Sequence, residues 1–122
     1  MLNQECVRAL LIHIDNYLQQ PGSRKFKVKH HLDDPELAEF TRDEILAATH
    51  YLVDSGWVIT ATLDKKRHAE NYHIIRLSPN GYRLLQAIND DTRWNKVKNI
   101  CGDIVQKTAP QLLAALGSKL FL

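Results

Sequence analysis

The residues best suited to chemistry in this sequence are three consecutive cations, Lys65, Lys66 and Arg67, which are followed by His68. They lie in a polar stretch, residues 63–70, between two segments rich in β-branched and aromatic residues. Flexible basic loops contact nucleic-acid phosphates, because each neutralised phosphate releases condensed counterions. An exposed turn that is simply solvated would have a similar composition. The cluster therefore supports two interpretations, phosphate binding and a solvated loop.

A second basic group lies in the alternating stretch at residues 25–29, Lys-Phe-Lys-Val-Lys. This alternation predicts a short strand with Phe26 and Val28 facing inward and the three lysines facing outward. Lysines on an outer strand also prevent unwanted strand addition. We favour this protective role, and a fold that covers the edge would favour phosphate binding instead.

If residues 41–55 form a recognition helix, their polar face is the region that would enter a DNA groove. Arg42 lies at its N-terminal end, where such helices reach base edges. Ala47 and His50 would contact bases or methyl groups. We therefore predict Arg42, Ala47 and His50 as DNA-contacting residues, together with Lys65, Lys66 and Arg67.

The same face also carries carboxylates, which a phosphate backbone repels. Asp43, Glu44 and Asp54 outnumber the single arginine on this face. The alternative is that the face binds a protein, with Asp43, Tyr51 and Asp54 as the contacting residues.

The sequence offers no catalytic or metal-binding motif. It contains no G-x-S-x-G, phosphate-loop or H-E-x-x-H pattern, and no two histidines have the i, i+4 spacing of a ligand pair. The acidic pairs Asp33-Asp34 and Asp90-Asp91 indicate helix starts, where the helix dipole favours negative charge. We expect no enzymatic activity, no metal and no cofactor.

Local signals predict the elements that must position these residues. Thr41 and Glu44 fit a capping box at the start of a helix, and Gly56 is suited to end it. Strands are predicted at 57–62 and 71–78, which would bury Trp57, Ile59, Ile74 and Leu77. Ser78-Pro79 then starts a helix that would bury Tyr82, Leu85 and Ile88.

The order of these elements is helix, short strand, turn, capped helix, strand, basic loop, strand and helix. This order predicts an α+β winged helix-turn-helix over residues 1–88, with 41–55 as the recognition helix and 63–70 as the wing. Residues 25–29 would form the outer strand of the small antiparallel sheet. A two-stranded hairpin alone is marginally stable, so it must pack on the helices.

Residues 89–122 are predicted to form a helical tail that packs on this core or forms a dimer interface. Trp94 is expected to pack the tail onto the core. The last helix has more apolar residues than a monomer needs to bury, and we predict a homodimer through them: Leu112, Leu113, Leu116, Leu120 and Phe121.

Two segments carry a resemblance to known proteins. THYLVDSGWVI resembles the way in which many bacterial winged-helix regulators leave the recognition helix. IRLSPNGYRLLQAINDDTRWNKVK resembles the central signature of a bacterial and prophage-associated domain family of unknown function. The chain departs from that signature at Tyr82, Leu85 and Gln86. The resemblance implies a winged-helix-like first half, a helical tail and a prophage context, and it implies no biochemical role.

The bulk composition is that of one folded domain. The chain has 122 residues, of which 44% are hydrophobic and 25% charged, with a net charge of +2. No apolar run is long enough to span a membrane, and the distant cysteines Cys6 and Cys101 indicate reduced, buried thiols in a cytoplasm. We expect a small prophage-type transcriptional regulator that binds double-stranded DNA, or alternatively a winged-helix module that binds a host protein.

Overall fold

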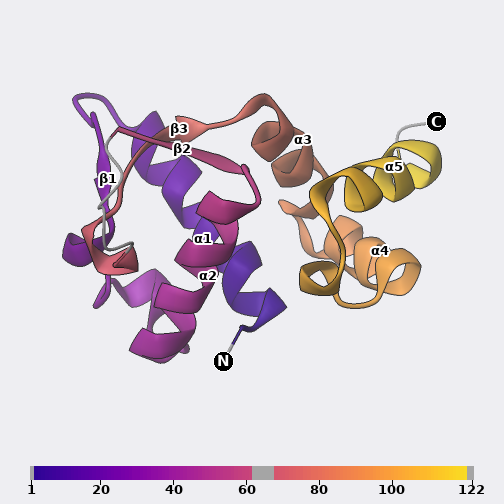
Figure 1. Cartoon of the computed structure of the whole chain (residues 1–122), viewed down its shortest axis with the longest axis horizontal. Helices are drawn as coiled ribbons and strands as arrows, with labels where there is room; N and C mark the ends of the chain where they lie inside the picture. The colour runs from indigo at the N-terminus through magenta and orange to yellow at the C-terminus, as the bar shows by residue number, and fades with distance from the viewer. Residues whose placement is uncertain (1, 62–67, 121–122) are drawn as a thin grey trace.

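The chain folds as a mixture of helices and one small antiparallel sheet, which confirms the α+β class (Figure 1). The computed structural model describes residues 2–61 and 68–120. Within them the α-helices and strands are α1 Gln4–Gln19, β1 Phe26–Lys27, α2 Arg42–Asp54, β2 Val58–Thr60, β3 His73–Leu77, α3 Pro79–Ile88, α4 Asp91–Cys101 and α5 Ala109–Leu120. Short 3-10 helices connect them at η1 Val28–His30, η2 Pro35–Leu37, η3 Ala69–Asn71 and η4 Ile104–Gln106.

Local hydrogen bonds explain where α1 and α2 begin and end. The Asn3 side chain accepts a hydrogen bond from the Glu5 amide at 2.9 Å and caps α1. The hydroxyl of Thr41 accepts from the Glu44 amide at 3.1 Å, and the Glu44 carboxylate accepts from the Thr41 amide at 3.0 Å. Gly56 follows α2 with φ 75°, a conformation that favours glycine. The predicted capping box and glycine stop are confirmed.

The sheet has the order β1-β3-β2, so β1 is an outer strand as predicted. The predicted length of this strand was wrong, because the chain turns into η1 directly after Lys27. Val28 still donates to the Tyr72 carbonyl at 3.1 Å, but the neighbouring chain then belongs to η3 and offers no further strand to pair with. Phe26 and Val28 are buried, as the alternation indicated.

A bulge in β3 changes the register between β3 and β2. Thr60 lies opposite Ile74 and Ile59 lies opposite Arg76, so Ile75 is an additional residue on β3. A bulge of this kind shifts the alternation of side chains by one residue. Residues three apart on β3 therefore face the same side of the sheet.

This register explains one error in the predicted core. Val58 lies opposite Leu77, and both are buried under the sheet together with Trp57. Ile59 was predicted to be buried, but it is only half-buried, on the outer side. Val58 rather than Ile59 is the inward-facing residue of this strand, so the alternation is shifted by one residue from the predicted one.

Helix α3 starts as predicted but presents a different face. The Ser78 hydroxyl accepts a hydrogen bond from the Gly81 amide at 3.0 Å. Leu84 and Ile88 are buried, whereas Tyr82, predicted to be buried, is 42% exposed. The helix packs through the face that includes Gly81, and this turns Tyr82 toward solvent.

Helices α4 and α5 complete the same hydrophobic core as α1. Trp94 is 2% exposed and its indole N–H donates to the Glu5 carboxylate at 2.9 Å, which confirms that it packs the tail onto the core. Leu112 and Leu116 are 0% and 1% exposed within this one chain. Their side chains are therefore already covered by this chain's own core, and their predicted role as dimer contacts stays a prediction.

The rest of the predicted dimer interface consists of Leu113, Leu120 and Phe121. Leu113 is half-buried against the core. The side chain of Leu120 and the whole of Phe121 lie outside the described residues. Dimerisation through these three residues stays a prediction.

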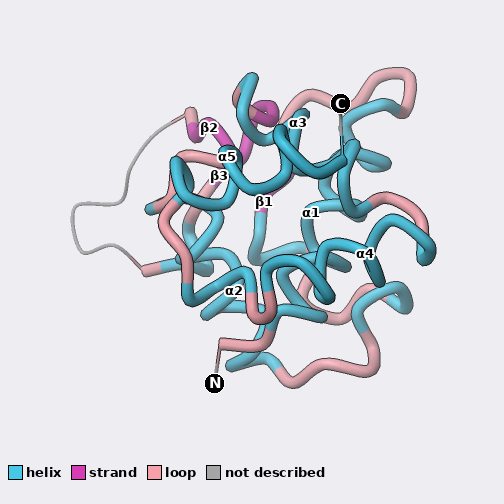
Figure 2. Tube along the Cα trace, turned by 90° about the vertical axis from the view of Figure 1, so that its right-hand side faces the viewer, coloured by secondary structure: helices cyan, strands magenta, loops and turns pink. Residues whose placement is uncertain are grey.

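Helices make up most of the described chain, and the sheet lies toward one side of it (Figure 2). None of the helices in the described residues is long and apolar enough to cross a membrane.

Candidate nucleic-acid interface

The outer face of the sheet gathers basic side chains from β1 and β3. Lys27 lies opposite His73, while the neighbouring pair Phe26 and Ile74 is buried. Because side chains alternate across a strand, Lys27 and His73 face outward. Lys25 has the same parity as Lys27 and is also exposed.

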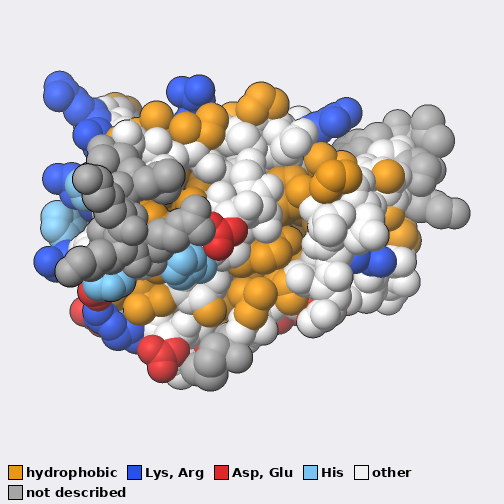
Figure 3. Space-filling view, viewed as in Figure 1, with side chains coloured by type: hydrophobic (Ala, Val, Ile, Leu, Met, Phe, Trp, Pro, Cys, Tyr) orange, Lys and Arg blue, Asp and Glu red, His pale blue; other side chains and the backbone are white. Residues whose placement is uncertain are grey.

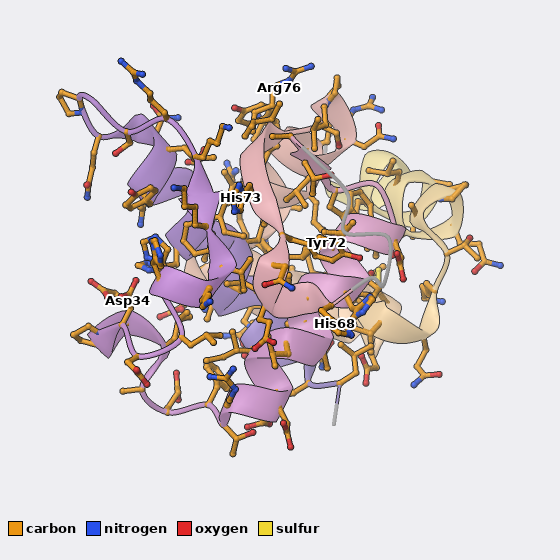
Figure 4. All side chains as sticks on the ribbon, turned by 60° about the vertical axis from the view of Figure 1, so that its left-hand side comes forward. Asp34, His68, Tyr72, His73 and Arg76 are labelled. Atoms are coloured by element: carbon orange, nitrogen blue, oxygen red, sulfur yellow. The ribbon has the colours of Figure 1, made fainter. Side chains whose placement is uncertain are left out.

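The bulge adds Arg76 to this face. Without it, residues 73 and 76 would lie on opposite sides of the sheet, since they are three positions apart. With Ile75 as the additional residue, His73 and Arg76 share the outer face (Figure 4). We call Lys25, Lys27, His73 and Arg76 the sheet-face basic group. Figure 3 shows Lys and Arg side chains along the edges where Figure 1 places β1 and the sheet.

The electrostatics of this face follow from its composition. Partial burial lowers the pKa of His73, and the nearby charges of Lys27, Lys25 and His30 lower it further. Among the described residues, no carboxylate lies within ion-pairing distance of Lys25, Lys27 or Arg76. Their positive charge is therefore available to an anionic ligand.

The predicted recognition surface on α2 is arranged differently. Arg42 donates to the Glu70 carboxylate at 2.6 Å, and this ion pair joins α2 to η3. Asp43 is exposed, and a ring nitrogen of His50 lies 3.6 Å from the Asp54 carboxylate. The Arg42 cation of this face is therefore matched by a carboxylate.

Two of the predicted DNA contacts line a shallow pocket between α2 and η3. Ala47 and His50 border it, and its volume is about 410 Å³. The other residues that line it are Leu46, His68, Ala69 and Glu70. Ala69 is buried against α2, so η3 covers part of the surface that was predicted to face DNA.

The hydroxyl group of Tyr51, a predicted partner contact, is not accessible to solvent. It is buried with no hydrogen-bond partner of good geometry among the described residues, and burial raises its pKa more than the nearby Trp57 and Ser55 side chains lower it. The structure leaves Asp43 and Asp54 as the exposed members of that predicted set.

Lys65, Lys66 and Arg67 lie outside the described residues. The chain leaves the described part after Ala61, whose amide donates to the His73 carbonyl at 2.9 Å.

The buried cysteines do not supply a nucleophile. Burial raises the pKa of the Cys6 thiol to about 12, and the carboxylates of Glu44 and Glu39 add to this rise. Burial also raises the pKa of Cys101. A thiol must ionise to react, so burial disfavours the reactive thiolate at both cysteines, and their predicted burial is confirmed.

Sequence reasoning missed two groupings. The first is the addition of His73 and Arg76 to Lys25 and Lys27, which depends on the register and the bulge. The second joins His13, His31 and Asp34, whose ring nitrogens and carboxylate lie within 4.8 Å of one another. No spacing pattern signals a contact between residues 18 and 21 positions apart.

These features define an α+β protein with a basic sheet face and a charge-paired helix face. The family model described as hypothetical protein (DUF2513) matches residues 1–107, so the chain belongs to this family of unknown function. This confirms the part of the predicted resemblance that concerns an uncharacterised family. No curated protein and no solved structure gives a significant match.

Proposed function

We propose that this protein is a winged-helix DNA-binding protein whose main phosphate contacts lie on the outer face of its sheet and on residues 65–67. The order α1, β1, η2, α2, β2, β3 and the strand order β1-β3-β2 are consistent with a winged helix. In this proposal η2 and α2 form the helix-turn-helix, and the segment between β2 and β3 is the wing.

The observation that carries the proposal is the positive charge of Lys25, Lys27 and Arg76, with which no carboxylate of the described residues pairs. A protective role for the lysines is less apt, because β1 has only two residues and offers little edge to protect. Their side chains instead join His73 and Arg76 on one face. A row of cations on one face is the arrangement that binds a phosphate backbone.

Recognition of the DNA sequence through base contacts plays the smaller part in this proposal. Arg42 is held by Glu70, so its guanidinium must leave that carboxylate before it can bind a base. Ala47 and His50 lie beside the pocket on α2 and are the remaining base contacts. We therefore expect affinity to come mostly from phosphates. A protein with this role would be a small prophage-type transcriptional regulator in a bacterial cytoplasm.

Duplex binding as a function of salt tests the proposal. Full-length protein should bind short DNA duplexes at about 50 mM salt and lose most of its affinity by about 200 mM. Replacing Lys65, Lys66 and Arg67 by alanine should weaken binding further. Failure to bind any of a set of genomic fragments at about 50 mM salt would overturn the proposal.

A second candidate function is protein binding through α2. The exposed carboxylates Asp43 and Asp54 lie on the same helix as the partly apolar pocket of Leu46 and Ala47. A basic host protein with an apolar side chain would complement this face. A pull-down from nuclease-treated host lysate would support this candidate if Asp43→Ala/Asp54→Ala abolishes capture of one protein. Recovery of nucleic acid alone, without nuclease, would count against it.

A further inference from the structure

Three donor groups from separate segments meet beside α1. His13 belongs to α1, His31 follows η1 and Asp34 precedes η2. Asp34 Oδ2 lies 2.7 Å from His13 Nε2 and 2.6 Å from His31 Nδ1. Both imidazoles therefore point a ring nitrogen at the same oxygen atom.

Neighbouring rings hold the two imidazoles in place. His31 stacks on Phe26 with centroids 4.1 Å apart and meets the edge of Tyr17 at 4.5 Å. His13 packs edge-on against Phe26 at 5.8 Å. Only 13% of the His13 side chain and 12% of the His31 side chain are exposed. Rings whose orientation is fixed by packing lose little freedom when they bind a ligand.

We propose that His13, His31 and Asp34 bind a divalent transition-metal ion, with Zn²⁺ the best match to the donor set. Two imidazole nitrogens and one carboxylate oxygen form the three-ligand set of open zinc sites, in which water completes the coordination. Imidazole also suits Co²⁺ and Ni²⁺, whereas Mg²⁺ and Ca²⁺ prefer oxygen ligands.

The geometry requires a small adjustment. Ligand atoms about 2.1 Å from a tetrahedral ion lie about 3.4 Å from each other. The Asp34 oxygen must then retreat by roughly 0.7 to 0.8 Å from the two nitrogens, and the nitrogens, which lie within 4.8 Å of each other, must also settle at about 3.4 Å from each other. Its side chain is 26% exposed and lies in a turn between η1 and η2, so such a shift disturbs little of the core.

Metal binding requires an unprotonated nitrogen on each ring. Burial alone would raise the pKa of Asp34, but hydrogen bonds from His13 and His31 hold it below its usual value, so the carboxylate is ionised at neutral pH. In a neutral ring that donates to Asp34, the single N–H proton must move to the other ring nitrogen, and the freed lone pair then binds the ion. Protons compete with the ion for these nitrogens, so affinity must fall in acid.

The site has a route to solvent. His13 also lines an open pocket of about 230 Å³, with Asn16 and Glu36 among its other residues. Arg8 borders this pocket too, but its guanidinium is engaged by the Ile88 carbonyl and Asp91. Water can complete the coordination from this side. The bound ion would link α1 to the segment that leads into α2.

The test uses full-length protein without a histidine tag and with its metals removed. Co²⁺ is added, its visible absorption is recorded, and Zn²⁺ is then added as a competitor. We expect one Co²⁺ per chain, displaced by Zn²⁺, and a rise in the melting temperature with either ion. His31→Gln and Asp34→Asn should weaken binding by about 100-fold or more.

His30 provides the matched control, because it neighbours His31 but is exposed and outside the cluster. His30→Gln should bind Co²⁺ as the wild type does. Circular dichroism shows whether each variant folds, and the wild-type titration is decisive even if one does not. Absence of Co²⁺ absorption at millimolar metal, or equal loss in His30→Gln and His31→Gln, would overturn the proposal and leave the cluster as a hydrogen-bonded link between α1 and η2.

Discussion

The outer face of the sheet and the exposed face of α2 both carry positive charge, but they differ in how that charge is matched. Arg42 on α2 has the Glu70 carboxylate at 2.6 Å. Lys27 and Arg76 on the sheet have no ion-pair partner among the described residues. The difference shows that the number of cations in a segment does not identify a phosphate-binding surface, because a neighbouring carboxylate can neutralise them.

The cause of the difference is the path of the chain after β2. The chain returns through η3, which packs on α2 and brings Glu70 to Arg42. It then enters β3, where the bulge at Ile75 turns Arg76 to the outer face. The chain from η3 into β3 therefore supplies the carboxylate that pairs with Arg42 on α2, and it also adds a cation to the outer face of the sheet.

The largest expected effect is the loss of stability when Gly81, which packs against the backbone of Trp57 just before β2, is replaced by alanine. A Cβ at this position would lie 1.9 Å from the Trp57 carbonyl oxygen, which also accepts from the Ser78 amide at 3.0 Å. Gly81→Ala should therefore lower the free energy of unfolding by about 3 kcal/mol or more, because backbone must move. Gly117→Ala is the control, since nothing lies within 4 Å of its Cβ and alanine favours the helix by up to about 1 kcal/mol. Denaturant titration measures both, and equal stabilities would contradict the packing described for Gly81.

A second prediction tests whether the apolar face of α5 stabilises this chain's own core or forms a dimer interface. Leu112→Ala should cost about 2 to 5 kcal/mol of unfolding free energy, because a buried leucine leaves a cavity. Leu113→Ala should cost less, since that side chain is half-buried. Denaturant titration and sedimentation are measured together. A Leu112→Ala protein that dissociates into monomers without losing stability would make α5 an interface after all.

A smaller effect is expected from releasing Arg42. Glu70→Gln removes the charge that holds the guanidinium, so duplex affinity should rise by about two- to fivefold, the strength of an exposed ion pair. Glu39→Gln removes an equal charge from an exposed position and serves as the control. Fluorescence anisotropy compares the two. If both variants bind as the wild type does, Arg42 does not face the DNA.

The smallest effect is a titration on the sheet face. Lys25 and Lys27 help to lower the pKa of His73. In the Lys25→Ala/Lys27→Ala variant the pKa of His73 should move up toward its ordinary value, because protonation no longer places a third positive charge beside two others. NMR of the imidazole carbon-bound protons follows it, and an unchanged pKa would mean that the lysines lie too far away to act on His73.

The sequence predicted the features that depend on neighbouring residues. The capping box of Thr41 and Glu44, the stop at Gly56 and the start at Ser78 each require hydrogen bonds or torsions within a few residues. Lys27 of β1 also faces outward and Lys25 is exposed, as the alternation of residues 25–29 indicated.

Features that depend on distant pairing were not predictable from spacing. The bulge at Ile75 and the ion pair of Arg42 with Glu70 arise from how β3 and η3 meet β2 and α2. The same holds for Leu112, whose apolar pattern predicted a buried face without indicating that this chain's own core covers it.

The central claim is that the sheet face, rather than α2, carries phosphate contacts. The direct measurement is the slope of the logarithm of the duplex binding constant against the logarithm of the salt concentration. Lys25→Ala/Lys27→Ala should reduce the slope by about two, one for each lost phosphate contact. Lys96→Ala/Lys107→Ala removes the same charge near α4, away from the sheet, and should keep the wild-type slope (Figure 1). An unchanged slope in the sheet variant, or an equal fall in both, would contradict the account.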